Sequence, residues 1–282
     1  MTNIANELVS FIMPVKGADP FQLRQSLKCI VSQTHDMIEV IIIFDEEGKA
    51  LDLENLSVLE EFKDDLRVKV YKRKAGRGLC AALNDGLRLS KGLFIARMDS
   101  DDISLTTRVE EQLLFIKKTD LSVLGTWAYL INQIGQVIGQ MTPPTKSSDI
   151  RRILMLHNPM IHSSILFPTK LVKEVGFFNP GLEGAEDYDF YIRCFAAGKQ
   201  IGNLDKPLLY LRENSRSITR GKRMIESRIY YLKTKIDATI NHGFRKPRDI
   251  LYLCLSPAMF FIPPSRVKTM KYLLGWFSSP KR

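Results

Sequence analysis

Short apolar runs alternate with helical segments over the first hundred residues of the chain. The predicted strands are residues 8–15, 38–44, 68–71 and 94–99, and the predicted helices are residues 21–33, 53–62 and 76–89. Proline and glycine residues mark the turns between several of these segments. This fourfold alternation predicts a parallel sheet that is covered by helices on both faces.

The order of elements is less regular after Thr106. The predicted elements are helices at 108–118 and 186–197, strands at 123–125 and 160–167, a hairpin from 129–131 to 136–138 that turns at Gly135, and an amphipathic segment at 224–240. The apolar blocks between residues 250 and 277 are split by prolines and fall short of the roughly 20 residues that a spanning helix needs. We therefore expect an α/β domain over residues 1–214 and a basic helical region over residues 215–282.

Composition narrows the class of protein. A chain of 282 residues, 45% of them hydrophobic, suffices for one large α/β domain or a domain with an appendage. The four cysteines form no Cys-x-x-Cys pair, which argues against a zinc site or a disulfide framework and fits a reducing compartment. No basic segment followed by an apolar core opens the chain, so we expect the catalytic part in the cytoplasm.

The net charge of +10 is concentrated at the C-terminal end. Residues 212–282 carry sixteen Lys or Arg and four acidic residues, whereas the first 211 residues carry 25 basic and 27 acidic residues. A basic region suits an anionic membrane surface, with Phe260, Phe261, Trp276 and Phe277 entering the interface on the inner face of the plasma membrane. The alternative is a helical subdomain packed on the body. No motif supports binding of nucleic acid.

Three carboxylates, those of Asp99, Asp101 and Asp102, follow the fourth predicted strand. Like charges repel, and an unpaired buried carboxylate costs several kcal/mol, so a positive group is expected beside them. Mg²⁺ or Mn²⁺ bridging to a phosphate is the natural candidate, since both ions prefer carboxylate and phosphate oxygens. A solvated acidic turn is the alternative, and Asp102 is interpreted as a supporting residue or a helix cap.

Further polar residues follow the neighbouring strands. Asp45 comes after the second predicted strand, and Arg73, Lys74 and Arg77 come after the third. Ligands of parallel sheets bind beyond the C-terminal ends of the strands, so we expect these residues near Asp99. For the three cations, a solvated basic turn is the alternative to phosphate binding.

The order of motifs resembles that of the family 2 glycosyltransferases. The matching segments are residues 13–15 (MPV), 33–34 (QT), 39–42 (EVII), Asp45, 78–86 (GLCAALNDG), 96–102 (ARMDSDD), Arg108, Gln112, 158–162 (NPMIH) and 184–189 (GAEDYD). The joint order and spacing over residues 9–214 are specific, although each motif alone is modest. The resemblance implies a GT-A fold, in which a Rossmann-like nucleotide-binding half is fused to an acceptor half, and an inverting mechanism.

The resemblance also implies a donor side for the site. Pro14 would be among the substrate-binding residues, and Asp45 would accept hydrogen bonds from the uracil or ribose of a nucleotide sugar. Asp99 would hold the ribose or the metal, and Asp101 would ligate the Mn²⁺ or Mg²⁺ that bridges the diphosphate and stabilises its growing charge. Independently of the resemblance, the position of Arg77 after the third predicted strand would bring it to the phosphates.

The acceptor side would lie at the second acidic pair. Asp187 would be the general base that takes the proton of the acceptor hydroxyl, with Glu186 in contact with substrate. Without the resemblance, both acids would simply favour a helix N-terminus. His162 would line the acceptor pocket or contact the diphosphate, with a structural histidine as the alternative. The segment around Arg212 resembles a family element that closes over the diphosphate.

Two departures bear on the function. Phe44 occupies the place of the first of two aspartates that usually end the family's second strand, which leaves the nucleotide base open. The Gln-x-x-Arg-Trp motif of processive synthases is absent, which favours transfer of a single sugar.

We expect transfer of a hexose from a nucleotide sugar, with UDP the expected nucleotide, to a lipid-linked oligosaccharide in O-antigen, capsule or exopolysaccharide biosynthesis. One alternative is a sugar nucleotidyltransferase, for which residues 13–17 lack the required glycine-rich, lysine-bearing loop. The other is a non-catalytic, membrane-bound scaffold that binds a sugar nucleotide.

Overall fold

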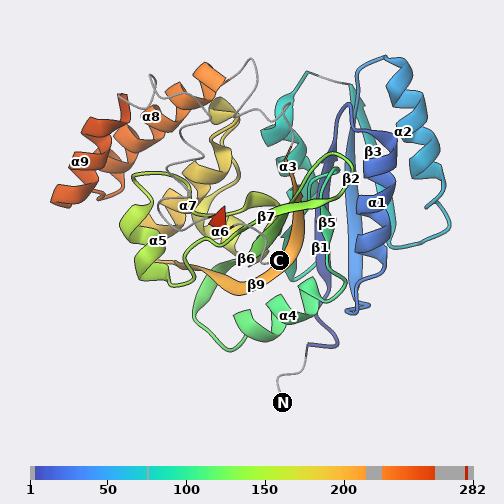
Figure 1. The fold of residues 1–282 in the computed structure, drawn as a ribbon, viewed down its shortest axis with the longest axis horizontal. Helices are drawn as coiled ribbons and strands as arrows, with labels where there is room; N and C mark the ends of the chain where they lie inside the picture. The colour runs from blue at the N-terminus through green and yellow to red at the C-terminus, as the bar shows by residue number, and fades with distance from the viewer. Residues whose placement is uncertain (1–3, 75, 214–223, 258–276, 279–282) are drawn as a thin grey trace.

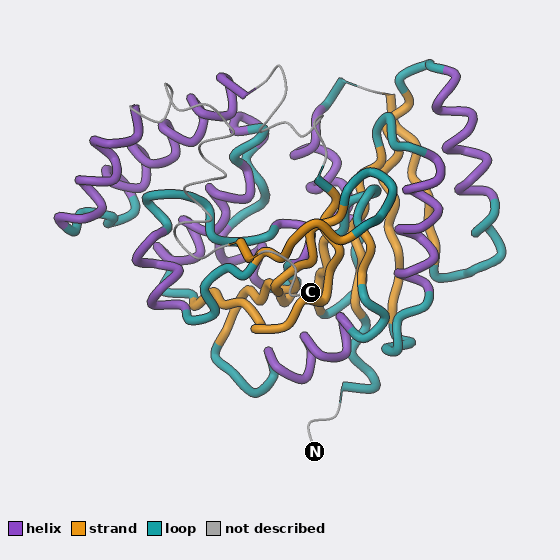
Figure 2. Tube along the Cα trace, viewed as in Figure 1, coloured by secondary structure: helices purple, strands orange, loops and turns teal. Residues whose placement is uncertain are grey.

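The computed structural model describes residues 4–74, 76–213, 224–257 and 277–278, whose strands form one mixed sheet between layers of helices (Figure 1, Figure 2). The strands are β1 (Val9–Val15), β2 (Ile38–Glu46), β3 (Val68–Lys74), β4 (Phe94–Arg97), β5 (Ile103–Ser104), β6 (Leu121–Ile131), β7 (Val137–Met141), β8 (Leu166–Pro168), β9 (Gln200–Arg212) and β10 (Phe277–Ser278). Their order along the sheet is β10-β7-β6-β8-β4-β1-β2-β3, and β9 pairs with β6 and β5.

The N-terminal half is the parallel sheet that the sequence predicts. Strands β3, β2, β1 and β4 run parallel, and α1 (Pro20–Val31), α2 (Ala50–Glu60) and α3 (Gly78–Leu89) connect them. Successive side chains of a strand face opposite sides, so Ile42 of β2 packs in the core with Leu27 of α1, whereas Ile41 packs with Ala82 of α3. Helices α1 and α2 therefore cover one face, and α3 covers the other.

The second half is built around β6. This strand is antiparallel to β7 and β8 and parallel to β9, while β8 pairs with β4 and so joins the two halves. The predicted hairpin turn is confirmed, because the Gly135 N–H donates to the Asn132 carbonyl at 3.0 Å and Gly135 has a φ of 86°. The helices of this half are α4 (Arg108–Ile116), α5 (Ser147–Ile153), α6 (Leu171–Val175) and α7 (Glu186–Ala196).

The prediction of a strand over residues 160–167 is wrong for most of its length. Residues His162–Ser164 form a 3-10 turn, and the strand begins only at Leu166. Two buried side chains of α4 hydrogen-bond the carbonyls of this turn. Arg108 Nη1 donates to Ser163 O and Gln112 Nε2 donates to Ser164 O, both at 2.9 Å. These bonds replace those that a strand neighbour would make.

Two further differences concern long strands. The segments predicted separately at 123–125 and 129–131 belong to the single strand β6, and β9 was not predicted. The β6–β9 pairing shifts register on either side of Trp127, which pairs with Pro207. This irregularity coincides with the Asp205-Lys206-Pro207 interruption that hides β9 in the sequence.

The C-terminal helices α8 (Met224–Asn241) and α9 (Pro247–Leu255) lie at the end of the molecule remote from α1 and α2 (Figure 1). Arg151 of α5 makes two hydrogen bonds of 3.0 Å to the carboxylate of Asp249, which is fully buried. The same guanidinium lies 3.7 Å from the ring centroid of the buried Phe244. These contacts join the described part of the C-terminal region to α5.

Among the described residues, no helix has the length and apolar character needed to cross a membrane. Of the residues predicted to enter a membrane interface, Phe260, Phe261 and Trp276 lie outside the part that the structure describes, and Phe277 begins β10, of which only the backbone is described. The membrane-binding role of this region stays a prediction.

Candidate active site

A cleft of about 740 Å³ opens beyond the C-terminal ends of β1 and β4. Its described lining consists of Lys16, Gly17, Ala18, Asp19, Gln22, Leu79, Arg97, Asp99, Ser100, Asp101, Asp102, Gln133, His162, Gly184, Glu186, Asp187, Leu211, Arg212 and Tyr231. Six residues that the sequence predicts for the site therefore meet in one cleft: Asp99, Asp101, His162, Glu186, Asp187 and Arg212.

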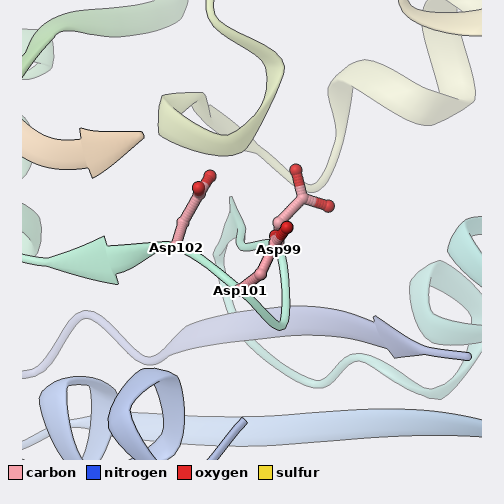
Figure 3. A group of neighbouring side chains, drawn as sticks. All are labelled: Asp99, Asp101 and Asp102. Atoms are coloured by element: carbon pink, nitrogen blue, oxygen red, sulfur yellow. The ribbon is translucent and has the colours of Figure 1, made fainter. Parts of the chain in front are cut away.

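Asp99, Asp101 and Asp102 form an acidic triad on the loop between β4 and β5. One carboxylate oxygen of each lies within 4.8 Å of the others, and Figure 3 shows the three side chains rising toward the same side. Asp102 is buried, and its burial beside the charges of Asp99 and Asp101 raises its pKa well above the ordinary value. The Ser163 side chain opposes this rise, but neither Asp102 Oδ2 nor Ser163 Oγ makes a hydrogen bond of ordinary geometry within the described residues.

This donor set fits Mn²⁺ or Mg²⁺. Three clustered carboxylates offer hard oxygen ligands, and the unpartnered Oδ2 of Asp102 leaves one buried ligand atom in need of a cation or a donor. The interpretation of Asp102 as a helix cap is wrong. Asp102 precedes β5, and its Oδ1 accepts the backbone N–H of Arg212 at 2.9 Å.

Arg97, which the sequence did not single out, is a buried cation on the floor of the cleft. It forms an ion pair with Asp99. Burial by itself lowers the pKa of Arg97, but the charges of Asp99, Asp102 and Glu186 raise it above its ordinary value. An arginine inside an apolar strand was the available signal, because a buried cation needs acidic neighbours.

Glu186 and Asp187 begin α7 and face the same cleft. The Asp187 carboxylate accepts two hydrogen bonds, from the Tyr188 N–H at 2.7 Å and from Asn158 Nδ2 at 2.6 Å. Burial raises the pKa of Asp187, and these two donors oppose that rise. Burial and the neighbouring Asp187 charge raise the pKa of Glu186 to about 7.

His162 lies in the 3-10 turn and lines the cleft. Burial, followed by the positive charge of Arg97, lowers its pKa well below the ordinary value, so the ring is neutral at pH 7. Its Nε2 is buried and has no hydrogen-bond partner within the described chain. A neutral ring nitrogen can donate or accept one hydrogen bond, and the described residues do not use this capacity.

Arg212, at the end of β9, connects three segments around the cleft. Its Nε donates to Asp101 O at 2.8 Å, and its Nη1 donates to the carbonyls of Asn132 and Gln133, both at 2.9 Å. Nη2 donates to Gln25 at 3.2 Å. The guanidinium thus holds the acidic loop against the β6–β7 turn, and its contact with a diphosphate stays a prediction.

Three predicted site residues, Pro14, Asp45 and Arg77, lie outside the described lining of the cleft. Asp45 is buried and paired with Arg73, whose Nη2 lies 3.1 Å from Asp45 Oδ2 and 2.7 Å from Gly78 O. Arg73 is therefore not part of a solvated turn. Arg77 is exposed, and Pro14 is a β1 residue opposite Ile43 of β2. The substrate contacts predicted for all three stay predictions.

Two more residues near the cleft were not predicted from the sequence. Asn158 belongs to a quoted motif, yet nothing in the sequence indicates that its amide meets Asp187. Tyr231 comes from α8, in the region predicted as a tail, and no local pattern marks it.

The fold and the site together define a glycosyltransferase of the GT-A type. The N-terminal half is a parallel sheet of the kind that binds nucleotides, the acidic triad lies at its edge, and a separate acidic pair lies in the same cleft. The chain belongs to the family described as Glycosyl transferase family 2, which matches residues 10–175.

Curated relatives agree with this assignment. The O-antigen biosynthesis glycosyltransferase WbnJ of Escherichia coli is 33% identical over 219 residues, which cover 76% of this chain and 83% of that protein. The amylovoran biosynthesis glycosyltransferase AmsE of Erwinia amylovora is 27% identical over 261 residues, covering 90% and 92%. An uncharacterized glycosyltransferase of Methanocaldococcus jannaschii is 27% identical over 232 residues, covering 80% and 79%.

Solved structures share the fold. S. aureus TarS in complex with UDP-GlcNAc aligns with a TM-score of 0.66 at 19% identity, covering 87% of this chain and 70% of that one. The mannosyltransferase PcManGT of Pyrobaculum calidifontis, in complex with GDP-Man and Mn²⁺, aligns with a TM-score of 0.62 at 14% identity, covering 95% and 80%. These neighbours confirm the predicted GT-A architecture.

Proposed function

We propose that this protein is an inverting, metal-dependent glycosyltransferase that moves a hexose from a nucleotide sugar to a lipid-linked oligosaccharide. The observation that carries the proposal is the division of one cleft into two acidic sites. The triad of Asp99, Asp101 and Asp102 lies after β4, and the pair of Glu186 and Asp187 lies at the start of α7. A donor site and an acceptor base on opposite sides of a sugar are what inversion requires.

On the donor side, Asp99 and Asp101 would hold Mn²⁺ or Mg²⁺, with Asp102 contributing its unpartnered oxygen. The bound ion would stabilise the negative charge of the departing nucleoside diphosphate. The complexes of TarS with UDP-GlcNAc and of PcManGT with GDP-Man and Mn²⁺ support a nucleotide-sugar donor. UDP is the nucleotide we propose, with Asp45, Pro14 and Arg77 contributing to its binding.

On the acceptor side, Asp187 acts as the general base. The acceptor oxygen bonds to the anomeric carbon as its proton passes to the Asp187 carboxylate. The bond from that carbon to the diphosphate oxygen breaks at the same time, and its electrons leave with the nucleoside diphosphate. Burial raises the pKa of Asp187, which makes it a better proton acceptor than an exposed aspartate.

Surface-polysaccharide assembly on the cytoplasmic face of the membrane is the proposed setting. The named relatives act in O-antigen and amylovoran biosynthesis, and their similarity covers most of this chain. Isoleucines at 225, 229, 236 and 240 are exposed on α8, at spacings that repeat along one helix face. Together with the basic composition of this region, they support contact with an anionic membrane surface.

The test is a donor screen with purified full-length protein and a synthetic lipid diphosphate-linked saccharide. UDP-glucose, UDP-galactose, UDP-GlcNAc and GDP-mannose are each supplied with Mn²⁺, and release of the nucleoside diphosphate is measured. We expect release with one donor, loss of release with EDTA, and inversion at the anomeric carbon by NMR. Release that is indifferent to EDTA would contradict the metal role.

The variant Asp187→Asn separates catalysis from mere binding. We expect transfer to fall by about 10²–10⁴-fold while binding of the donor is kept, because a general base contributes that factor. The control is Asp205→Asn, an exposed carboxylate outside the described lining of the cleft. Unchanged transfer by Asp187→Asn would refute the assignment of the base.

A further inference from the structure

Helix α8 forms part of the cleft wall and contacts the start of α7. Ser227 Oγ donates to Gly184 O at 2.8 Å, two residues before Glu186. The ring of Tyr231 stacks on Tyr188, with centroids 4.8 Å apart and an interplanar angle of 27°. Because Tyr231 also lines the cleft, the C-terminal region supplies a side chain to the same site as the acidic pair.

Asn158 connects Tyr231 to Asp187. Its Oδ1 accepts the backbone N–H of Met160 at 3.1 Å, which fixes the orientation of the amide. Its Nδ2 is thereby directed to Asp187 Oδ2, at 2.6 Å. The same amide lies near enough to the Tyr231 hydroxyl to oppose the rise that burial causes in the pKa of the phenol. An amide nitrogen has two protons, so one can bind the carboxylate while the other binds the phenol oxygen.

We propose that Tyr231 is a positioning residue for the Asp187 carboxylate, acting through Asn158, and that α8 is thereby an integral part of the catalytic site. The inference rests on the proposed role of Asp187 as the base. A general base must lie within hydrogen-bond reach of the proton that it takes, and small displacements of reacting groups reduce rates steeply. Tyr231 restrains the amide, the amide restrains the carboxylate, and stacking on Tyr188 restrains Tyr231.

The groups around Asp187 determine how its pKa changes when Tyr231 no longer orients Asn158. The titratable or charged groups that interact with Asp187 come from four elements: Glu186 and Tyr191 on α7, Arg97 on β4, Cys80 on α3 and the Tyr231 hydroxyl on α8. The hydrogen bond from Asn158 favours the ionised form of Asp187 and so opposes the effect of burial. A poorly oriented Asn158 therefore raises the pKa of the base.

The test compares Tyr231→Phe with Tyr230→Phe. Both variants delete one hydroxyl from α8 and keep the ring. Tyr231 lines the cleft, whereas Tyr230 is not part of the described lining and its ring lies beside Lys233. With the donor found in the screen, we measure kcat, the KM for donor, the pH profile and thermal unfolding. For Tyr231→Phe we expect kcat to fall about tenfold or more. The KM for donor should be unchanged and the acidic limb of the pH profile should move to higher pH.

Tyr230→Phe should match the wild type in all four measurements. A Tyr231→Phe variant with the kcat and pH profile of Tyr230→Phe would overturn the inference. A lower kcat with an unmoved acidic limb would overturn it too, since a purely structural contact changes kcat without changing the base. Asn158→Ala, which removes the linking amide, should show the same shift of the limb, enlarged.

Asp187→Asn separates this inference from the proposed function. If that variant loses transfer while Tyr231→Phe behaves like the wild type, the positioning role fails and the base assignment stands. If Asp187→Asn transfers normally, the base assignment fails, and the positioning role fails too because it depends on that assignment.

Discussion

The carboxylate of Asp102 accepts a hydrogen bond of 2.9 Å from the backbone N–H of Arg212, which lies 110 residues later in the chain. This bond fastens the acidic triad to the end of β9. A second bond joins the same two segments, because the Arg212 side chain donates from Nε to Asp101 O. One oxygen of Asp102 thus holds two segments together, whereas the other is buried without a described partner. The two oxygens should be separable by substitution.

Asp102→Asn and Asp102→Ala should differ in stability and agree in metal binding. The asparagine keeps an oxygen for the Arg212 N–H, so its free energy of unfolding should stay near that of the wild type. The alanine leaves that donor unpaired and should cost about 1–3 kcal/mol in urea unfolding. Both remove the ligand oxygen, so Mn²⁺ binding, followed by electron paramagnetic resonance, should weaken about tenfold or more. Undiminished Mn²⁺ binding by both variants would exclude Asp102 as a ligand.

Glu186→Gln should stabilise the protein at alkaline pH. The folded pKa of Glu186 is raised from 4.5 to about 7, so the folded state binds more protons than the unfolded state between these values. Stability therefore falls as pH rises through that window, and the ionised side chain costs on the order of 3 kcal/mol at pH 8. Thermal unfolding of Glu186→Gln should show a gain at pH 8 that disappears near pH 4. The exposed Glu54→Gln should show no such dependence.

His162→Phe distinguishes a ligand-binding histidine from a structural one. Nε2 is buried without a described partner, and the ring packs against Phe178 with centroids 5.6 Å apart. A phenyl ring keeps this contact and removes the unpaired nitrogen, so thermal stability should be equal or higher. If the nitrogen binds substrate, transfer should fall about tenfold, and His162→Gln should restore part of it. Unchanged transfer by His162→Phe would leave only the structural role.

The parallel half of the fold follows from the sequence because its central strands, β1 and β2, are buried on both faces and read as nearly continuous apolar runs. The second half does not, since its strands depend on partners far away in the chain. Residues 160–167 have the apolar character of a strand, but Arg108 and Gln112 bind the carbonyls that a neighbouring strand would bind. Strand β9 contains Pro207, which removes a donor and breaks the pattern that would reveal it.

The acidic residues of the site were accessible to sequence reasoning because carboxylates gathered at strand and helix ends repel one another and so indicate a nearby cation or a catalytic role. Their supporting groups were not. Arg97 stands inside an apolar strand, which is a signal in the sequence, but the acids that surround it are known only from the structure. Tyr231 reaches the cleft because α8 packs on α7, a tertiary contact without a local signature. Asp45 likewise has its carboxylate paired with Arg73, a partner that the alternation of strands and helices does not specify.

Arg151→Ala should destabilise the protein and loosen α9. Asp249 is fully buried, and the two 3.0 Å bonds from Arg151 compensate most of its charge, with Lys246 N–H as a further donor. Removing one partner of a buried pair leaves an uncompensated charge, at a cost of about 3–5 kcal/mol. We expect a lower urea midpoint and faster amide hydrogen exchange in α9.

The matched control for this prediction is Arg152→Ala. Arg152 is the next residue on α5, but its side chain is 60% exposed and lies 3.6 Å from Asp149, one turn away on the same helix. Exposed pairs of this kind contribute about 0–1 kcal/mol, so the control should unfold close to the wild type. Because α8 carries Tyr231 and packs on α9, Arg151→Ala should also lower kcat, whereas Arg152→Ala should not. Equal stability of the two variants would show that the buried pair does not hold the C-terminal helices in place.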